Sequence, residues 1–201
     1  MSRSVAIVLF DDVEVLDACG PFEVFSVANR VADRAGSARP FEVSLVGIDD
    51  RPVVARGGMR IGVDTTIDDP RGYDVVLVPG GVVDAIEKNA RVLEWLQRTR
   101  PGAELVASVC TGAFVLAAAG LLDTRPVTTH WEDLEQLSAR WPALVVHEAV
   151  RYIDHGDLAT SAGISAGLDL ALHLVARWAG ADHALATASQ MDYDWSGAEH
   201  P

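Results

Sequence analysis

Cys110 is the residue with the clearest capacity for chemistry. It ends the apolar run 104–109, and Thr111-Gly112 and an Ala/Leu-rich segment follow directly. A buried strand, a sharp turn at a thiol and an immediate helix make a nucleophile elbow. The helix N-terminus would set N–H groups and positive potential beside a thiolate, the reactive form of cysteine. The alternative is a buried, unreactive cysteine, so the elements around Cys110 must decide between the two.

Two other stretches fall where predicted strands end. A loop carrying Asp17 follows the apolar run 4–10, and Gly80-Gly81 follows the run 74–78. Sites in parallel α/β sheets lie at the carboxyl ends of strands, near a topological switch point. We therefore expect Asp17, Gly80, Gly81 and Cys110 to lie close together.

The alternation of apolar runs predicts an α/β fold: a three-layer sandwich, flavodoxin-like, with a mostly parallel sheet and helices on both faces. Residues 53–64 predict a β-hairpin added antiparallel to that sheet. Further short strands are predicted at 41–47, 127–129, 145–150, 152–154 and 158–161. Helices are predicted from Pro21 to about residue 32 and at 83–98, 111–119, 131–140, 164–179 and 182–190. We expect one domain over residues 1–201, with a core of about 5–193 and a polar C-terminal tail.

Composition excludes several classes of protein. The net charge of −13 disfavours a phosphate backbone, so we expect no nucleic-acid partner. No apolar stretch suits a bilayer and no cleavable signal is evident, which predicts a cytoplasmic chain without a membrane partner. Cys19 and Cys110 are the only cysteines, and two free thiols are expected in a reducing cytosol. The scattered histidines predict no metal site.

Five ordered motifs resemble the ThiJ/PfpI superfamily, which is related to class I glutamine amidotransferases. They begin at Leu16-Asp17, Val78-Pro79, Ser108-Val109, Thr128-Thr129 and Thr160-Ser161, and together they span nearly the whole chain. Two branches are most similar: the isonitrile hydratases, and the N-terminal sensing domain of AraC-type regulators. The regulators continue into a DNA-binding half, and its absence after Gln190 favours a stand-alone hydratase-like protein.

The resemblance implies roles for single residues. Cys110 is the implied nucleophile and Asp17 its proton partner, where other branches carry Glu. Thr111 contributes its backbone N–H and hydroxyl, and Gly80 and Gly81 would stabilise developing negative charge or simply form a tight turn. Ile164 lines the pocket in similar hydratases, although a core role fits its spacing equally well.

His130 is either a residue that orients Cys110 or a structural one. Cys19 is expected to be a bystander.

The resemblance therefore implies a lyase that adds water to an isocyanide without a cofactor, through a thioimidate on Cys110. A homodimer and a small-molecule substrate are also implied. A sensing domain that binds ligand without turnover is the main alternative. A peptidase or glyoxalase role is disfavoured by Asp17, and oxidation of Cys110 would not discriminate between functions.

Overall fold

Seven strands form the main sheet in the computed structural model, which describes residues 2–195 and 197. In spatial order they are β10 (Tyr152–Asp154), β11 (Leu158–Ser161), β7 (Leu105–Val109), β6 (Val75–Val78), β1 (Arg3–Leu9), β2 (Phe41–Gly47) and β5 (Thr65–Thr66). Every neighbouring pair is parallel except β10 and β11. The central strands β6 and β7 are apolar and buried along their whole length, as strands covered on both faces must be.

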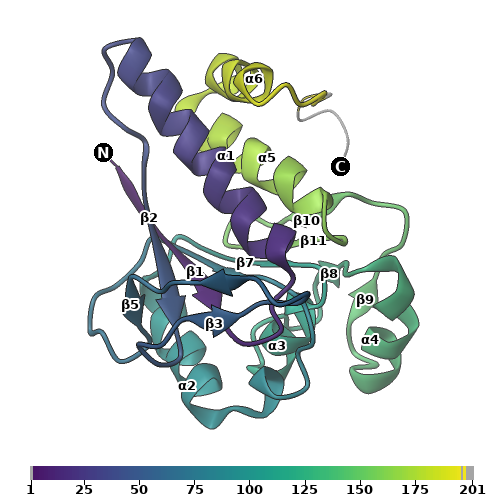
Figure 1. Cartoon of the computed structure of the whole chain (residues 1–201). Helices are drawn as coiled ribbons and strands as arrows, with labels where there is room; N and C mark the ends of the chain where they lie inside the picture. The colour runs from purple at the N-terminus through teal and green to yellow at the C-terminus, as the bar shows by residue number, and fades with distance from the viewer. Residues whose placement is uncertain (1, 196, 198–201) are drawn as a thin grey trace.

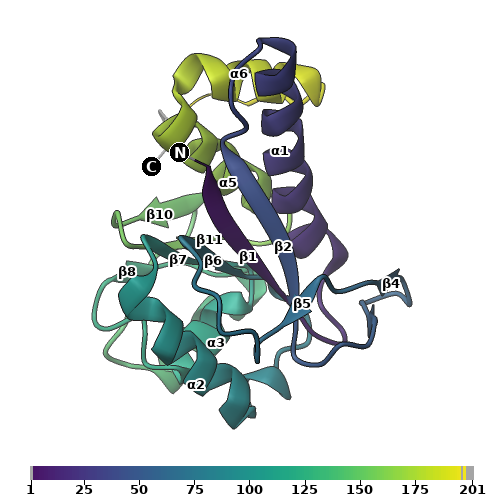
Figure 2. The ribbon, with the colours of Figure 1, turned by 90° about the vertical axis from the view of Figure 1, so that its left-hand side faces the viewer.

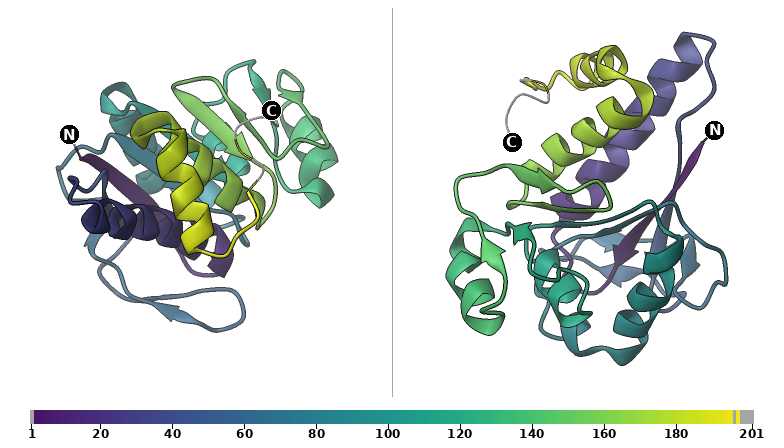
Figure 3. Two further views of the ribbon diagram at one scale, coloured as in Figure 1. Left: turned by 90° about the horizontal axis from the view of Figure 1, so that it is seen from above. Right: turned by 180° about the vertical axis from the view of Figure 1, so that it is seen from behind.

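Helices cover both faces of this sheet. Figure 1 shows α1 (Val15–Arg34), α5 (Ala166–Ala179) and α6 (Ala181–Gln190) on one face, with α2 (Ala90–Thr99) and α3 (Gly112–Ala118) on the other. The view from above in Figure 3 shows α1, α5 and α6 packed against one another. The predicted three-layer α/β sandwich with a mostly parallel, flavodoxin-like sheet is confirmed.

A smaller unit extends the structure beside β11. It consists of α4 (Leu134–Arg140) and the short parallel pair β8 (Pro126–Val127) and β9 (Val145–Val146). The predicted strands 127–129 and 145–150 are longer than these. The difference arises because Thr128 and Thr129 do not extend the β8–β9 pairing: the Thr128 N–H donates to the Thr160 hydroxyl, and the Thr129 hydroxyl donates to the Cys110 carbonyl.

Helix α1 corrects one prediction. It begins at Val15, ahead of Pro21, so Asp17 lies in its first turn and not in a loop. Pro21 is commonest in a first turn because it has no N–H to donate, and that preference placed the predicted start too late. Within α1 the missing N–H costs one hydrogen bond, and burial of Val24, Phe25 and Ala28 against the core stabilises the helix.

The predicted hairpin also differs in its pairing. Strands β3 (Val53–Val54) and β4 (Arg60–Ile61) are antiparallel, but they form a two-stranded sheet of their own that projects from the main one (Figure 2). The edge of β2 is occupied by β5, so the hairpin cannot add there. Instead it joins the loop before α1: Asp12 N–H donates to Val54 O, and Arg56 N–H donates to Val13 O.

Two helix starts and the C-terminal tail also differ from the prediction. The predicted helix 83–98 is a 3-10 turn, Ile86–Lys88, followed by α2, whose N-cap Asn89 accepts from Arg91 N–H at 3.1 Å. Helix α5 starts two residues later than expected, because Ile164 has a φ of 51°. Trp195, placed in the predicted polar tail, is buried, and residues 196 and 198–201 of that tail lie outside the described residues.

Across the described residues, no helix combines the length and apolarity that crossing a bilayer requires.

Candidate active site

Cys110 forms the turn between strand β7 and helix α3. Its φ of 57° lies in the left-handed region, which residues with side chains rarely adopt. Its N–H lies 3.1 Å from Ser161 O and 3.3 Å from Ala162 O, at the end of β11, and its carbonyl accepts from the Thr129 hydroxyl at 2.8 Å. The strained turn is therefore fixed by two neighbouring segments. It is the strand–turn–helix elbow that the sequence predicts.

Asp17 is fully buried in the first turn of α1, next to the Cys110 thiol. Its Oδ2 accepts from Gly80 N–H at 3.1 Å. Its Oδ1 is buried and has no hydrogen-bond partner in the described part of the chain. Burial raises the pKa of Asp17 to about 7, although the thiol and the Gly80 N–H each oppose that rise.

The pKa of the Cys110 thiol differs from the sequence-based expectation. A helix N-terminus should lower its pKa, and the Thr111 and Ile164 N–H groups do act in that direction. Burial outweighs them, and the negative charge of Asp17 adds to it, so the pKa of Cys110 is raised. At neutral pH the thiol keeps its proton, and the carboxyl beside it is the group that titrates. The two side chains therefore titrate as a coupled pair.

The Gly80-Gly81 turn brings these groups together. Thr111 Oγ1 accepts from Gly81 N–H and donates to Gly81 O, both at 2.9 Å. Gly81 has a φ of 137°, and a Cβ there would lie 2.2 Å from Asp12 O, so only glycine fits. Both glycine N–H groups thus hold the side chains of Asp17 and Thr111. Their predicted role in stabilising negative charge remains a prediction.

Cys110 lies at the floor of a cleft of about 300 Å³. Only 6% of the residue is exposed, whereas Ile164 at the cleft wall is 38% exposed. Thr111, Phe114 and His130 complete the surroundings of the thiol. The structure therefore brings Cys110, Thr111, Gly81, His130 and Ile164 to one cleft, with Asp17 and Gly80 directly behind it.

His130 packs flat against the chain near Ile164. A Cβ on Gly163 would lie 2.0 Å from the His130 ring, so glycine is required for that close approach. Nδ1 accepts from Glu132 N–H at 3.4 Å and lies 3.4 Å from Asp133 Oδ2. These contacts cap the 3-10 turn Trp131–Asp133 and orient the ring toward the cleft wall. They fit both a structural and an orienting role, and that choice stays open.

Sequence reasoning missed much of the cleft wall. Arg56 comes from the hairpin, Asp84 and Glu87 from the segment after Gly81, and Arg140 from α4. Glu87 is buried and pairs with Arg140 through two hydrogen bonds of 3.0 Å. None of these residues lies in a motif, and the segments that carry them meet only in the folded chain. The one available signal was the position of residues 83–87 directly after a strand end.

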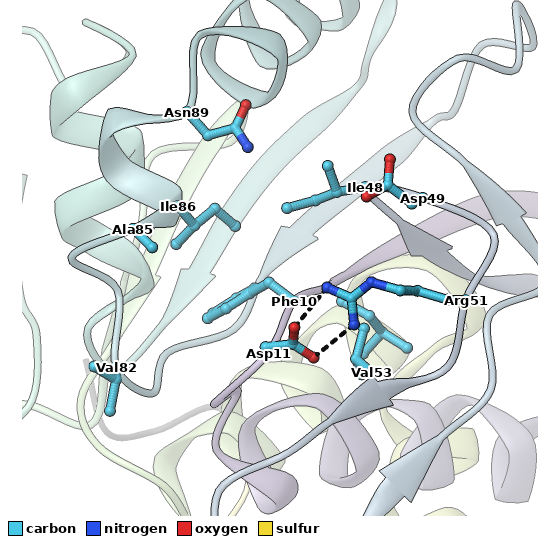
Figure 4. A pocket seen from close by; sticks show the side chains of 11 residues that line it. Phe10, Asp11, Ile48, Asp49, Arg51, Val53, Val82, Ala85, Ile86 and Asn89 are labelled. Atoms are coloured by element: carbon cyan, nitrogen blue, oxygen red, sulfur yellow. Dashed lines mark hydrogen bonds and ion pairs between the residues drawn. The ribbon is translucent and has the colours of Figure 1, made fainter.

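A second hollow of about 230 Å³ lies on the other side of residues 82–89 (Figure 4). Phe10, Ile48 and Ile86 give it apolar walls, and Arg51 is paired with Asp11 at 2.6 Å. Val82 borders both hollows. Neither cysteine of the chain is among the residues that line this hollow.

Among the described residues, no group of three or more His, Cys, Asp or Glu side chains is arranged to hold a metal ion. Cys19 is half-buried on α1, where burial raises the pKa of its thiol. Cys19 is not among the residues that line the cleft.

Comparisons with known proteins agree on one family. The sequence profile of the DJ-1/PfpI family matches residues 3–177. Isonitrile hydratase of Pseudomonas putida is 34% identical over 194 residues, covering 96% of this chain and 79% of that protein. The HTH-type transcriptional regulator CdhR of Pseudomonas aeruginosa is 30% identical over 190 residues, and this chain spans 55% of its length.

Solved structures show the same fold. A ThiJ/PfpI family protein from Pseudomonas syringae superposes with a TM-score of 0.84 at 26% identity, covering 96% of this chain and 76% of that one. An AraC family transcriptional regulator from Pseudomonas putida superposes with a TM-score of 0.78 at 22% identity, covering 94% and 99%. Because the profile spans most of the sequence and the relatives agree with it, the chain belongs to the DJ-1/PfpI family.

Proposed function

We propose that the protein hydrates an isonitrile to an N-substituted formamide. The observation that carries this proposal is the buried pair of Asp17 and Cys110, in which a carboxyl with a pKa raised to about 7 lies beside a protonated thiol. The 34% identity to isonitrile hydratase supports it. The chemistry needs a nucleophile and a proton at the same carbon, and this pair supplies both.

The first step adds the thiol across the isocyanide carbon. The Asp17 carboxylate takes the proton from Cys110 Sγ as sulfur attacks, and then delivers that proton to the same carbon. A C–S bond and a C–H bond form, which gives a thioimidate. The Thr111 and Ile164 N–H groups next to the sulfur stabilise negative charge on it during transfer.

The second step releases the product. The Asp17 carboxylate removes one proton from a water molecule that attacks the thioimidate carbon, and the second proton of that water passes to the substrate nitrogen. The C–S bond then breaks, the formamide leaves, and the sulfur recovers its proton from Asp17. One water is consumed for each isocyanide. Asp17 acts in both steps, which requires a carboxyl that gains and loses a proton near neutral pH.

The test measures formamide production from a panel of aliphatic and aromatic isocyanides. Wild type should turn over at least one of them, whereas Cys110→Ala and Asp17→Asn should each lose at least a thousandfold in kcat/KM. Cys19→Ser is the matched control, because it removes the only other thiol, outside the cleft, and should keep its activity. Full activity of Cys110→Ala would rule the mechanism out.

A second candidate is a sensing domain, because the regulator CdhR is 30% identical over 94% of this chain. That function predicts tight binding of a small molecule without turnover. The same panel separates the two: saturable binding in calorimetry with no formamide would favour the sensing domain.

A further inference from the structure

The wall of the Cys110 cleft carries more negative than positive charge. Five acidic side chains line it, against two guanidinium groups. The acidic residues are Glu14, Asp84, Glu87, Glu132 and Asp133, and the basic ones are Arg56 and Arg140. A protonated His130 would leave the acidic groups in excess.

The two arginines do not neutralise the cleft mouth. Arg140 is committed to Glu87 through both of its terminal nitrogens. Arg56 reaches Glu14 only at 3.7 Å and is 61% exposed.

Three carboxylates at the mouth have no guanidinium partner. Asp84 forms no ion pair within the part of the chain that the structure describes. Within the described residues, Glu132 and Asp133 pair only with Nδ1 of the His130 ring, at 3.8 and 3.4 Å. The three carboxylates come from two separate segments, after β6 and before α4, that both line the cleft.

The groups at the floor of the cleft add to this negative charge. Asp17 and Cys110 hold a dissociable proton between them, and the buried Oδ1 of Asp17 has no regular hydrogen-bond partner among the described residues. A substrate carboxylate at the mouth would lie beside Asp84 and Glu132, which have no guanidinium partner among the described residues, and would be repelled by them. A substrate cation would meet Asp84 and Glu132 at the mouth, while the exposed Val82 and Ile164 side chains offer an apolar surface to its carbon chain.

We propose that the cleft selects isocyanides with a cationic group remote from the reacting carbon and rejects those with a carboxylate there. The proposal rests on the isonitrile hydration argued above and specifies the substrate class for that site.

The test compares three isocyanides of equal chain length, ending in a dimethylammonium, a methyl or a carboxylate group. At low salt, kcat/KM for the cationic substrate should exceed that for the anionic one at least tenfold, and 0.5 M NaCl should shrink the ratio. Glu132→Gln and Asp84→Asn should each reduce the ratio severalfold. Glu135→Gln removes the same charge from α4 outside the cleft lining, so it should leave the ratio unchanged.

Failure of this inference is distinguishable from failure of the proposed function. Turnover of all three substrates with equal kcat/KM would overturn charge selection and leave hydration standing. If no isocyanide is turned over, calorimetry with the three corresponding formamides tests selection directly. The cationic formamide should then bind at least tenfold more tightly than the anionic one, and equal affinity would overturn the inference.

Discussion

The Asp17 carboxylate has two opposite effects on the Cys110 thiol. In the proposed mechanism the carboxylate accepts the thiol proton, yet its charge disfavours the free thiolate, because it raises the pKa of Cys110. Under that mechanism the thiol is activated only when an electrophile arrives and the proton moves to Asp17.

Replacing Asp17 with asparagine separates these two effects. Asp17→Asn removes the negative charge beside the thiol, so the pKa of Cys110 should fall and alkylation by iodoacetamide at pH 8 should become severalfold faster. The asparagine oxygen still accepts from Gly80 N–H, which preserves the local packing. Isonitrile turnover should be lost in the same variant, because the proton acceptor is gone.

Mass spectrometry of the peptide that contains Cys110 gives the alkylation rate, and the peptide that contains Cys19 is the internal control. A slower reaction of Cys110 in Asp17→Asn would contradict the assignment of Asp17 as the charge that holds the thiol protonated.

The residues that meet at the site were predictable where a sequence motif contains them. Cys110, Asp17 and Thr111 were identified because strand ends and the family motifs mark them. The state of the thiol was not predictable, since burial is a property of the packed fold and overrides the local effect of the helix N-terminus. The acidic residues of the cleft wall were missed for a related reason: Asp84 and Glu132 are distant in sequence and meet only through the topology.

At the scale of elements, the segment after Gly81 and helix α4 form one wall of the cleft. They are joined by the ion pair between Glu87, whose side chain is 2% exposed, and Arg140, whose side chain is 37% exposed. Arg140 also stacks on Trp141, 4.4 Å from the ring centroid, and lies 5.4 Å from that of Phe114. The pair therefore fixes the position of α4 and of the Phe114 face in the cleft.

We expect Arg140→Met to destabilise the protein by about 2 kcal/mol, because it leaves the Glu87 carboxylate buried without its bidentate partner. This destabilisation is smaller than the usual cost of breaking a fully buried ion pair, because Arg140 is partly exposed to solvent. The double variant Glu87→Met with Arg140→Met should recover much of the loss. Urea unfolding of the wild type, both single variants and the double variant measures the coupling. Additive losses would show that the two side chains act independently.

Periodicity located most elements, and the errors came from competing interactions. Strands β10 and β11 were predicted to the residue, because apolar residues and a turn bound them. The start of α1 was predicted too late because Pro21 was assigned to a first turn, whereas packing of α1 against the core tolerates it inside the helix. The hairpin was predicted, but its separation from the main sheet depends on β5, a two-residue strand too short to show a pattern.

For the molecule as a whole, Asp17 makes stability depend on pH. Burial raises its pKa from 3.8 to about 7 in the folded state, so the folded chain holds a proton that the unfolded chain releases above about pH 4. This contribution to stability is complete below the unfolded pKa and is lost as pH rises toward the folded one. The loss is about 1.4 kcal/mol for each pH unit within that window.

Asp17→Asn cannot ionise, so it should be more stable than wild type at pH 8 and should lose that advantage progressively toward pH 4. Between pH 5 and pH 8 the difference in unfolding free energy should change by about 2 to 3 kcal/mol. Urea unfolding of both proteins across this range measures it, and subtraction cancels the other titrating groups. Asp50→Asn, at an exposed site, is the control and should track wild type at every pH. A constant difference between Asp17→Asn and wild type would mean that Asp17 is ionised throughout this range, and burial would then not raise its pKa.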